Sequence, residues 1–450
     1  MAEPARATVV IVNWNGERLL RSCLDALARQ QADFAYETWV VDNASTDGSV
    51  ALLEREYPDV RVLRNGANLG FAGGNNTALR QIRTPYAVLL NNDATPEPDW
   101  LGQLLAPFDV PGNERLAAVT SKVVFEPTFL RLSLATPGFF PGGGDPRELG
   151  VRLFEVCVED VRCVDRVLME KLTWGPEGVG AGRFRWTRTS GELLVPLPAG
   201  HPGPYEVTLR MAAETTKPVT VSWEGGSAEL TATTDPTDVV FEVPAGVPTV
   251  DVVNNVGSIV TKAGYGADRG YQDVDDGRYD EPTDVFALCG CAVAFRTDAG
   301  RAVDWFDDDF FLYYEDTDLS WRLRAAGWSI RYEPKAAVRH VHSASAVEWS
   351  PTFTFHTTRN RLLMLVKNAG AQQARHEYVS FLADTAQMVL RVLSQLLHAR
   401  RPAARPLLFR LKVLRSLVRL TPVMLRRRRA VARTSTRTRA ELEEWLVVGR

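Results

Sequence analysis

In the first part of the chain, short apolar runs alternate with amphipathic stretches, and this alternation constrains the fold more than any other feature. The apolar runs have the length of strands and fall at residues 8–12, 38–41, 60–63 and 86–90. The stretches with helical spacing fall at residues 17–30, 49–57 and 75–81. Strands that alternate with helices predict a mostly parallel sheet, in which ligands bind beyond the carboxyl ends of the strands.

The middle of the chain has a different pattern. Gly and Pro are frequent at residues 137–146, and short alternating segments separated by turn residues follow them. This pattern predicts a β-sandwich inserted at residues 128–250. Its tryptophans Trp174, Trp186 and Trp223 could stack on sugars and make the insert carbohydrate-binding, or they could be aromatic residues of its core.

The α/β pattern returns near Val285. We expect a helix at residues 318–326 that ends at Gly327, and a strand at residues 329–332. After Thr352 the sequence is helical almost to its end. The chain is therefore predicted to be an α/β protein with an inserted β-sandwich and a helical C-terminal region.

The helical C-terminal region is strongly basic. No Asp or Glu occurs between Arg401 and Ala440, although the net charge of the chain is -3 and gives no reason to expect nucleic acid. One helix face collects Leu408, Leu411, Leu414, Leu417 and Val418. A basic amphipathic helix predicts peripheral contact with an anionic membrane, and the alternative is a helix packed on the catalytic domain with a solvated basic face.

The cysteines and the N-terminus bear on the compartment. The chain has five cysteines, an odd number with no disulfide or zinc spacing, which favours small buried thiols in a reducing environment. The first residues show no secretory signal, and no window reaches the apolar length of a spanning helix. We therefore expect a cytoplasmic protein, at the inner face of the cell membrane if its tail binds lipid.

Polar residues follow the expected strands. Asp42 closes the second strand and could accept hydrogen bonds from a base or ribose, or it could cap the next helix together with Asp47. Residues 68–76 form a glycine-rich loop that opens a helix. The N-terminus of that helix could bind a phosphate, or the loop could be a plain structural turn. Residues 91–93 end in a carboxylate that suits a hard divalent cation bridging a diphosphate, or they form an Asx turn before Pro96.

Two further groups lie in the second half. Glu315 and Asp316 sit among aromatic and apolar residues, so one of them could be a general base, or they could cap a helix that Asp318 could cap instead. His340 and His342 point the same way in an extended strand. A lone histidine is usually structural, but near Asp93 an imidazole would suit Mn²⁺ or Mg²⁺.

Together these motifs resemble those of family 2 glycosyltransferases of GT-A fold, notably the branch of bacterial rhamnosyltransferases. The resemblance covers roughly residues 7–126 and 250–365, and neither the insert nor the tail. It is carried, in matching order and spacing, by residues 10–15, 41–48, 68–76, 90–93, 311–322 and 339–345, and also by the segment from Gly270 to Gly290.

The resemblance implies an inverting, metal-dependent transferase. It would move a sugar, rhamnose from dTDP-rhamnose or a sugar from a UDP donor, to a saccharide or lipid-linked saccharide acceptor in cell-surface polysaccharide synthesis. Asp316 would be the base and Glu315 would shape the acceptor site, while Asp93 and His340 would hold Mn²⁺ or Mg²⁺. The donor nucleotide would be bound by Asn13, Asp42, Asn68, Gly70, Asn75 and Asn92. Asn91 stands where the family often has a first metal-binding carboxylate, which leaves Asp93 and His340 as the expected protein ligands.

The resemblance and the pattern of the remaining sequence together predict a division of the chain. Residues 1–127 would be the nucleotide-binding half of the catalytic domain, and residues 251–352 its acceptor half. Residues 128–250 would be the inserted sandwich, and residues 353–450 the basic helical region. The sequence is compatible with a homo-oligomer.

The alternative functions are a glycoside hydrolase, because paired carboxylates also cleave sugar bonds, and a non-catalytic carbohydrate-binding protein.

Overall fold

The computed structural model describes residues 4–159, 161–162, 167–178, 182–198, 200–341, 350–398 and 404–448. The chain forms two compact units. The α/β unit comprises Met1–Glu126, Val253–Tyr271 and Asp276–Arg450, and the sandwich unit comprises Pro127–Val252 and Gln272–Asp275. His342 and Cys163, which the sequence singled out, lie outside the described residues.

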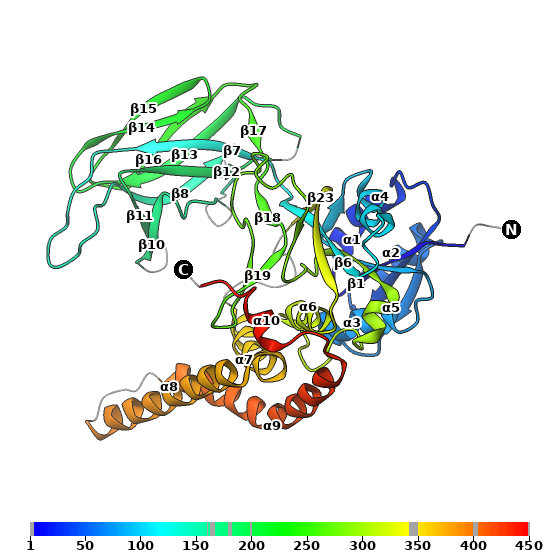
Figure 1. Ribbon diagram of the computed structural model, residues 1–450. Coiled ribbons are helices and arrows are strands. Elements are labelled where there is room, and N and C mark those ends of the chain that lie inside the picture. Colours follow the sequence, from blue (N-terminus) through cyan, green and yellow to red (C-terminus); the bar gives the residue numbers. More distant parts are fainter. Residues whose placement is uncertain are drawn as a thin grey trace. The chain divides into compact units, whose positions relative to one another are not determined.

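A ten-stranded sheet forms the centre of the α/β unit (Figure 1). Its main path runs β21 (Thr283–Asp284), β23 (Ser329–His340), β6 (Leu116–Phe125), β22 (Ala292–Arg296), β4 (Tyr86–Leu90), β1 (Ala7–Asn13), β2 (Tyr36–Asp42) and β3 (Arg61–Arg64), with β18 (Val253–Asn255) on β6 and β5 (Ala94–Pro96) on β23. Strands β3, β2, β1 and β4 pair in parallel. Because β22 is antiparallel to both β4 and β6, and β23 is parallel to β6, most of the path runs in one direction. The predicted mostly parallel sheet is confirmed.

The apolar runs form strands because both faces of the sheet are buried. Successive side chains of β1 alternate between two hydrophobic clusters, with Val9 and Ile11 in one and Val10 in the other. Helix α1 covers the first cluster with the stripe that its spacing predicts, which includes Leu20 and Leu24. The helices before the C-terminal region are α1 (Glu17–Ala28), α2 (Ser49–Glu56), α3 (Gly70–Leu79), α4 (Trp100–Leu105), the 3-10 helix η1 (Ala106–Asp109), α5 (Thr297–Ala302) and α6 (Glu315–Ala325).

Three expected boundaries are wrong. Helix α3 begins at Gly70 rather than at residue 75, so the glycines belong to the helix itself. They let it lie close to β1, since a Cβ on Gly74 would be 2.8 Å from Val12 Cγ1. Helix α6 begins at Glu315, three residues before the expected start. Strand β23 continues to His340 because it pairs with β6 beyond a register shift.

The sandwich unit consists of two antiparallel sheets that share one hydrophobic cluster, to which Leu134 and Val219 contribute from one sheet and Leu209 and Val243 from the other. One sheet has the order β10 (Thr173–Glu177), β11 (Phe184–Thr187), β8 (Arg152–Val158), β13 (Tyr205–Ala212) and β16 (Thr237–Val243), with β9 (Val161–Arg162) on β8. The other has the order β12 (Ser190–Pro196), β7 (Phe129–Ala135), β14 (Lys217–Trp223) and β15 (Gly226–Ala232), with β17 (Thr249–Val250) on β7.

The three tryptophans of the sandwich have different surroundings. Trp223 packs against the core and stacks on Phe241, with ring centroids 6.0 Å apart. Trp174 lies 3.9 Å from the guanidinium of Arg188, and Trp186 makes edge contacts with neighbouring aromatic rings outside the core cluster. Of the three tryptophans, Trp223 is thus a core residue of the sandwich, whereas Trp174 and Trp186 lie outside its core cluster.

The C-terminal region is helical, as predicted. It consists of α7 (Pro351–Asn368), α8 (Ala371–Leu397), α9 (Ala404–Thr434) and α10 (Arg439–Glu443). Helices α7 and α9 share a buried cluster with Trp321 of α6, to which Leu363 and Leu417 belong. Among the described helices, none combines the length and the apolar character needed to cross a membrane. A short strand pair, β19 (Ser258–Val260) and β20 (Gly266–Asp268), completes the unit.

Candidate functional site

The ends of β1, β2 and β4 meet at one edge of the sheet. Asn13 and Asp42 are register partners, and Asn92 Nδ2 donates to Asn13 Oδ1 at 2.8 Å. Asp42 Oδ2 accepts from the Ser45 amide at 3.2 Å, whereas its Oδ1 is buried with no hydrogen-bond partner among the described residues. A buried carboxylate oxygen without a donor is costly, so this atom is suited to a donor from a ligand.

Asp42 does not cap the following helix. Helix α2 begins after Gly48, and the carboxylate near its start is Asp47, whose Oδ1 accepts from the Ser49 amide at 3.1 Å. The other oxygen of Asp47 accepts from the Glu17 amide at the start of α1. The capping alternative therefore fits Asp47 and not Asp42.

The start of α3 is closed by protein groups. Asn68 Oδ1 accepts from the Gly70 amide at 2.8 Å, and the Ala72 amide donates to Phe311 O at 3.2 Å. Gly70 has a φ of +70°, and a Cβ there would lie 2.3 Å from Phe311 O. These two amides are already bonded, so they do not form the phosphate cradle that the glycine-rich sequence suggested. The bond from the Ala72 amide to Phe311 O joins α3 to the segment that leads to Glu315.

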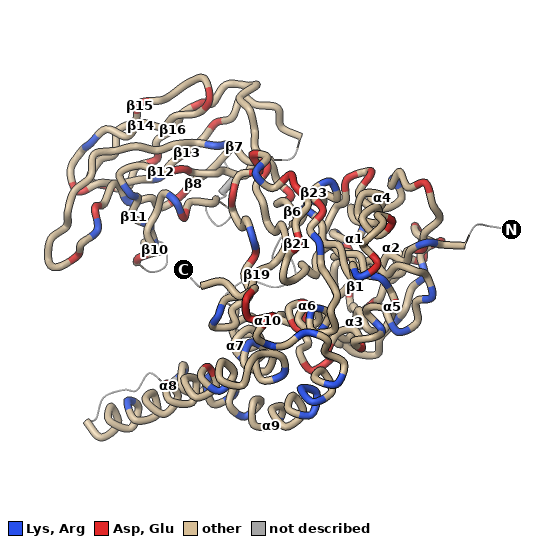
Figure 2. Tube along the Cα trace, viewed as in Figure 1, with Lys and Arg blue, Asp and Glu red and all other residues tan. Residues whose placement is uncertain are grey.

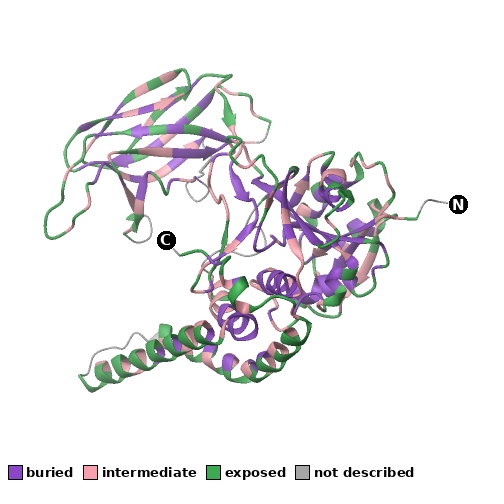
Figure 3. Cartoon of the chain, in the orientation of Figure 1, coloured by how far each residue is buried: buried purple, intermediate pink, exposed green. Residues whose placement is uncertain are grey.

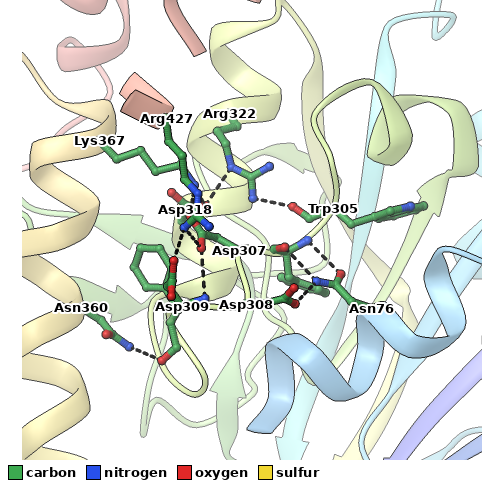
Figure 4. Close-up of polar contacts among 12 residues, drawn as sticks. Asn76, Trp305, Asp307, Asp308, Asp309, Asp318, Arg322, Asn360, Lys367 and Arg427 are labelled. Atoms are coloured by element: carbon green, nitrogen blue, oxygen red, sulfur yellow. Dashed lines mark hydrogen bonds and ion pairs between the residues drawn. The ribbon is translucent and has the colours of Figure 1, made fainter. Parts of the chain in front are cut away.

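The two asparagines within α3 have structural partners. Asn75 is buried, and its Nδ2 donates to Phe71 O of its own helix at 2.9 Å. Asn76, which the sequence did not single out, donates to Phe306 O at 2.9 Å and accepts from the Phe306 amide at 3.2 Å (Figure 4). Asn76 therefore ties α3 to residues 306–308, although no sequence pattern distinguishes it from Asn75.

The structure brings Asp93 and His340 together, across 247 residues of sequence. Strand β5 pairs with the end of β23, which places Asp93 Oδ1 3.1 Å from His340 Nε2. Both residues are buried. On the other side of the ring, His340 Nδ1 lies 2.9 Å from Asn254 Oδ1, on β18. Asn254 was missed because the sequence around it carries no recognisable motif.

This arrangement fits a divalent cation. If Nδ1 donates its proton to Asn254 Oδ1, the Nε2 lone pair faces the carboxylate of Asp93, and these two acceptors could share a divalent cation. Histidines that bind metals usually donate the other ring N–H to such a partner. Within the described ranges, no cluster of three or more His, Cys, Asp or Glu suits a metal.

Glu315 and Asp316 begin α6 after a strained segment. Phe311, Tyr313 and Tyr314 all have φ between 66° and 70°, a region that non-glycine residues rarely adopt. Asn360 of α7 holds this segment, because its Nδ2 lies within 2.9 Å of three backbone oxygens. Strain of this kind persists only where the surrounding structure fixes it, as it often does at functional sites.

The two adjacent carboxyls have different electrostatic environments. Burial, followed by the charge of Asp268, raises the pKa of Asp316 to about 6, although the amides of Thr317 and Gly290 oppose the shift. Burial and then the charge of Asp316 raise the pKa of Glu315 well above its usual range, and Glu315 Oε2 has no hydrogen-bond partner in the described part of the chain. Asp316 can therefore take up a proton near pH 6, whereas burial and the charge of Asp316 disfavour ionisation of Glu315.

The segment Cys289–Cys291 links Asp316 to the end of β4. A Cβ on Gly290 would lie 3.8 Å from Asp316 Cβ, and Cys291 O accepts from the Asn91 amide at 2.8 Å. The charge of Asp93 raises the pKa of the Cys291 thiol, after burial and Cys289. One short segment thus touches both Asp316 and the turn that carries Asp93.

Asp318 does not cap α6. Because the helix begins at Glu315, Asp318 is fully buried and accepts from Arg322 at 2.8 Å and from Lys367 at 2.8 Å (Figure 4). Lys367 also donates to Asp307 at 2.7 Å, and Arg427 of α9 contacts Asp307. Although burial opposes the change, Arg322 and Lys367 lower the pKa of Asp318 to about 2. This ionic cluster fastens α6 to α7 and α9.

Two family models match the chain. The model described as Glycosyl transferase family 2 matches residues 8–144, and the model described as Glycosyl transferase family group 2 matches residues 242–430. Together they cover every strand of the central sheet and most of the C-terminal helices.

Individual proteins match over shorter stretches. An uncharacterised glycosyltransferase of Bacillus subtilis, YfnE, is 33% identical over 90 residues, which are 20% of this chain and 23% of that protein. The N-acetylglucosaminyl-diphospho-decaprenol L-rhamnosyltransferase of Mycobacterium tuberculosis is 41% identical over 64 residues, which are 14% of this chain and 20% of that protein. The crystal structure of GalNAc-T7 with UDP, GalNAc and Mn²⁺ aligns with a TM-score of 0.46 and 11% identity, over 83% of this chain and 50% of that one.

Proposed function

Since the chain belongs to glycosyl transferase family 2, we propose that it is an inverting enzyme that moves a sugar from a nucleoside diphosphate to an acceptor hydroxyl. The observation that carries the proposal is the pairing of Asp93 with His340 at the sheet edge where Asp316 also contacts residues 289–291. A glycoside hydrolase would need the paired carboxyls but not the buried metal-binding pair, and a non-catalytic lectin would need neither.

We assign the donor to the ends of β1, β2 and β4. Asp93 and His340 would hold Mn²⁺ or Mg²⁺, which neutralises charge on a departing diphosphate. Asn13 and Asp42 would contact the nucleoside, and the buried Asp42 Oδ1 is suited to a ribose hydroxyl or base N–H. Asn68, Gly70 and Asn92 would border the diphosphate, whereas Asn75 would act through the packing of α3, because its side chain bonds its own helix.

We assign the base to Asp316. Its carboxylate would take the proton of the acceptor hydroxyl while that oxygen attacks the anomeric carbon on the face opposite the diphosphate, which inverts the sugar. Such base catalysis contributes roughly 10²–10⁴-fold to the rate. Glu315, whose ionisation burial disfavours, would shape the acceptor site beside it.

For the substrates we propose rhamnose from dTDP-rhamnose, with a UDP-linked sugar as the second candidate, and a saccharide or lipid-linked saccharide acceptor in cell-surface polysaccharide synthesis. The similarity to a mycobacterial rhamnosyltransferase supports this choice over part of the chain. Trp174 and Trp186, which lie outside the sandwich core, are candidates for contact with a saccharide.

Thermal-shift measurements with dTDP, UDP and GDP, each with and without Mn²⁺, test this proposal. We expect one nucleotide to raise the melting temperature only when Mn²⁺ is present, and its sugar conjugate to be turned over with release of the diphosphate. Asp93→Asn should lose the stabilisation, and Asp298→Asn, at a carboxylate that is 96% exposed, should keep it. If none of the diphosphates stabilises the wild type and no donor is turned over, the proposal is wrong.

A further inference from the structure

The far end of α8 carries leucines that no part of the chain covers among the described residues. Leu390, Leu393, Leu396 and Leu397 are 50–85% exposed, and their spacing places them along one side of the helix (Figure 3). Val379 and Leu382 continue the same side toward the start of α8. A run of exposed leucines of this length is unusual on a protein that meets only water.

Helix α9 has two apolar faces. Val413, Leu417, Leu420 and Met424 are buried in the cluster shared with α7. The opposite face presents Leu408, Leu411, Val418 and Leu425, which are 41–66% exposed. Packing of α9 on the rest of the α/β unit therefore explains only its inner face. The apolar stripe that the sequence predicted on one face is divided, because Leu417 points inward while Leu408, Leu411 and Val418 point outward.

The charges around the far end of α8 and along α9 have one sign, whereas Asp384, 3.6 Å from Arg410, lies beside Leu382. No Asp or Glu occurs from Thr385 to Ala440. Arg415, Arg419 and Arg426 are exposed on the outer side of α9, and Arg391 is exposed among the leucines of α8. Figure 2 shows the basic residues along α9. An apolar face bordered by arginines matches the boundary between acyl chains and anionic headgroups.

We propose that the outer faces of α8 and α9 are a docking surface for an anionic lipid bilayer, on which both helices lie in the plane of the headgroups. The leucines would enter the acyl region, and the arginines would contact the phosphates. A second copy of this chain is a poorer occupant, because a symmetric contact would bring the same arginines face to face. The proposal rests on this surface alone and does not depend on the proposed donor, acceptor or base.

Flotation of the full-length chain with phosphatidylcholine vesicles, with or without phosphatidylglycerol, tests the proposal. We expect binding only to vesicles that contain phosphatidylglycerol, weakened by high salt because exposed charges are screened. Leu393→Glu together with Leu397→Glu should lower the vesicle partition coefficient about tenfold or more per leucine. Arg415→Gln with Arg419→Gln should lower it about fivefold per arginine. Val110→Glu, at an apolar residue 51% exposed elsewhere in the unit, should have no effect.

Three outcomes would overturn the proposal. The wild type could fail to float with either vesicle, or the leucine variants could float as well as the wild type while keeping their melting temperature. Alternatively, light scattering could show a dimer in the absence of lipid that the leucine variants dissociate, which would assign the surface to a second copy.

Discussion

Asp316 illustrates how much a single residue depends on its surroundings. Its carboxyl has a raised pKa of about 6, caused mainly by burial and then by Asp268, a residue that no motif marks. The raised value means that the ionised form is less favourable in the folded chain than in the unfolded one. The contribution of this group to stability is therefore full below its ordinary pKa and is lost as pH rises through about 6.

The same shift predicts a pH profile. We expect kcat/KM to rise about tenfold per pH unit below pH 6 and to level off above it, because the base must be ionised. Asp268→Asn removes a repulsive charge, so it should move the midpoint to lower pH. Initial rates between pH 4 and 8 would measure both effects, and a midpoint that does not move in Asp268→Asn would contradict the assigned cause.

Asn254 is predicted to act through His340. Asn254→Leu removes the acceptor 2.9 Å from Nδ1, which should raise the Mn²⁺ concentration for half-maximal activity by about 10–100-fold. Asn254→Asp keeps an acceptor and should restore most of the metal affinity. Mn²⁺ titrations of activity and of nucleotide binding would check this, and identical curves for wild type and Asn254→Leu would exclude the role.

For single residues, the sequence motifs predicted which side chains belong to the site better than they predicted which residues those side chains contact. Asp93 and His340 could be named from motifs, but their contact depends on the pairing of β5 with β23, which no local pattern encodes. Asn254 and Asp268 lie in segments without a motif, so only the fold reveals them. Asn75 was expected to bind the donor because of the resemblance, and the structure shows that its Nδ2 donates to Phe71 O of its own helix.

Among the elements, the segment before α6 determines where the carboxyls lie. Its left-handed residues are Phe311, Tyr313 and Tyr314 rather than glycines, so no glycine marks the turn. The start of the helix was therefore predicted three residues too late. The strands and the amphipathic helix α1 were predictable because burial of one or both faces leaves a periodic pattern.

Asn360 is predicted to position the base. Asn360→Ala removes one donor from the oxygens of Phe310, Leu312 and Tyr313, which should cost about 1–3 kcal/mol of stability. If the segment loosens, kcat should fall at saturating donor while the donor KM changes little. Steady-state kinetics alongside thermal melts would test this. A variant that loses stability but keeps kcat would limit Asn360 to a structural role.

The ionic cluster of α6, α7 and α9 is predicted to be a stability element. Lys367→Met would leave the buried carboxylates of Asp307 and Asp318 with fewer partners, and should lower the free energy of unfolding by about 3–5 kcal/mol. Lys335→Met, at an exposed lysine, is the matched control. Denaturant unfolding would measure the difference, and equal stability of the two variants would refute the role.

For the whole molecule, the α/β unit carries every residue that we assign to donor, metal and base, and the sandwich unit carries none of them. The alternation of strands and helices was readable over the first hundred residues or so, where burial is periodic. The second half of the site was readable only in part, through the resemblance. Strand β18, which carries Asn254, pairs with β6, and Cys291 O accepts from the Asn91 amide, and local spacing encodes neither contact.

The central claim is that Asp93 helps to hold the cation that binds the donor phosphates, while Asp316 takes the proton of the attacking acceptor hydroxyl. Calorimetric titration of the nucleoside diphosphate with Mn²⁺, combined with turnover, separates the two roles in Asp93→Asn and Asp316→Asn. We expect Asp316→Asn to bind the nucleotide like the wild type and to lose roughly 10²–10⁴-fold in kcat. We expect Asp93→Asn to lose Mn²⁺-dependent binding. An Asp316→Asn variant with wild-type turnover, or an Asp93→Asn variant with unchanged binding, would contradict the claim.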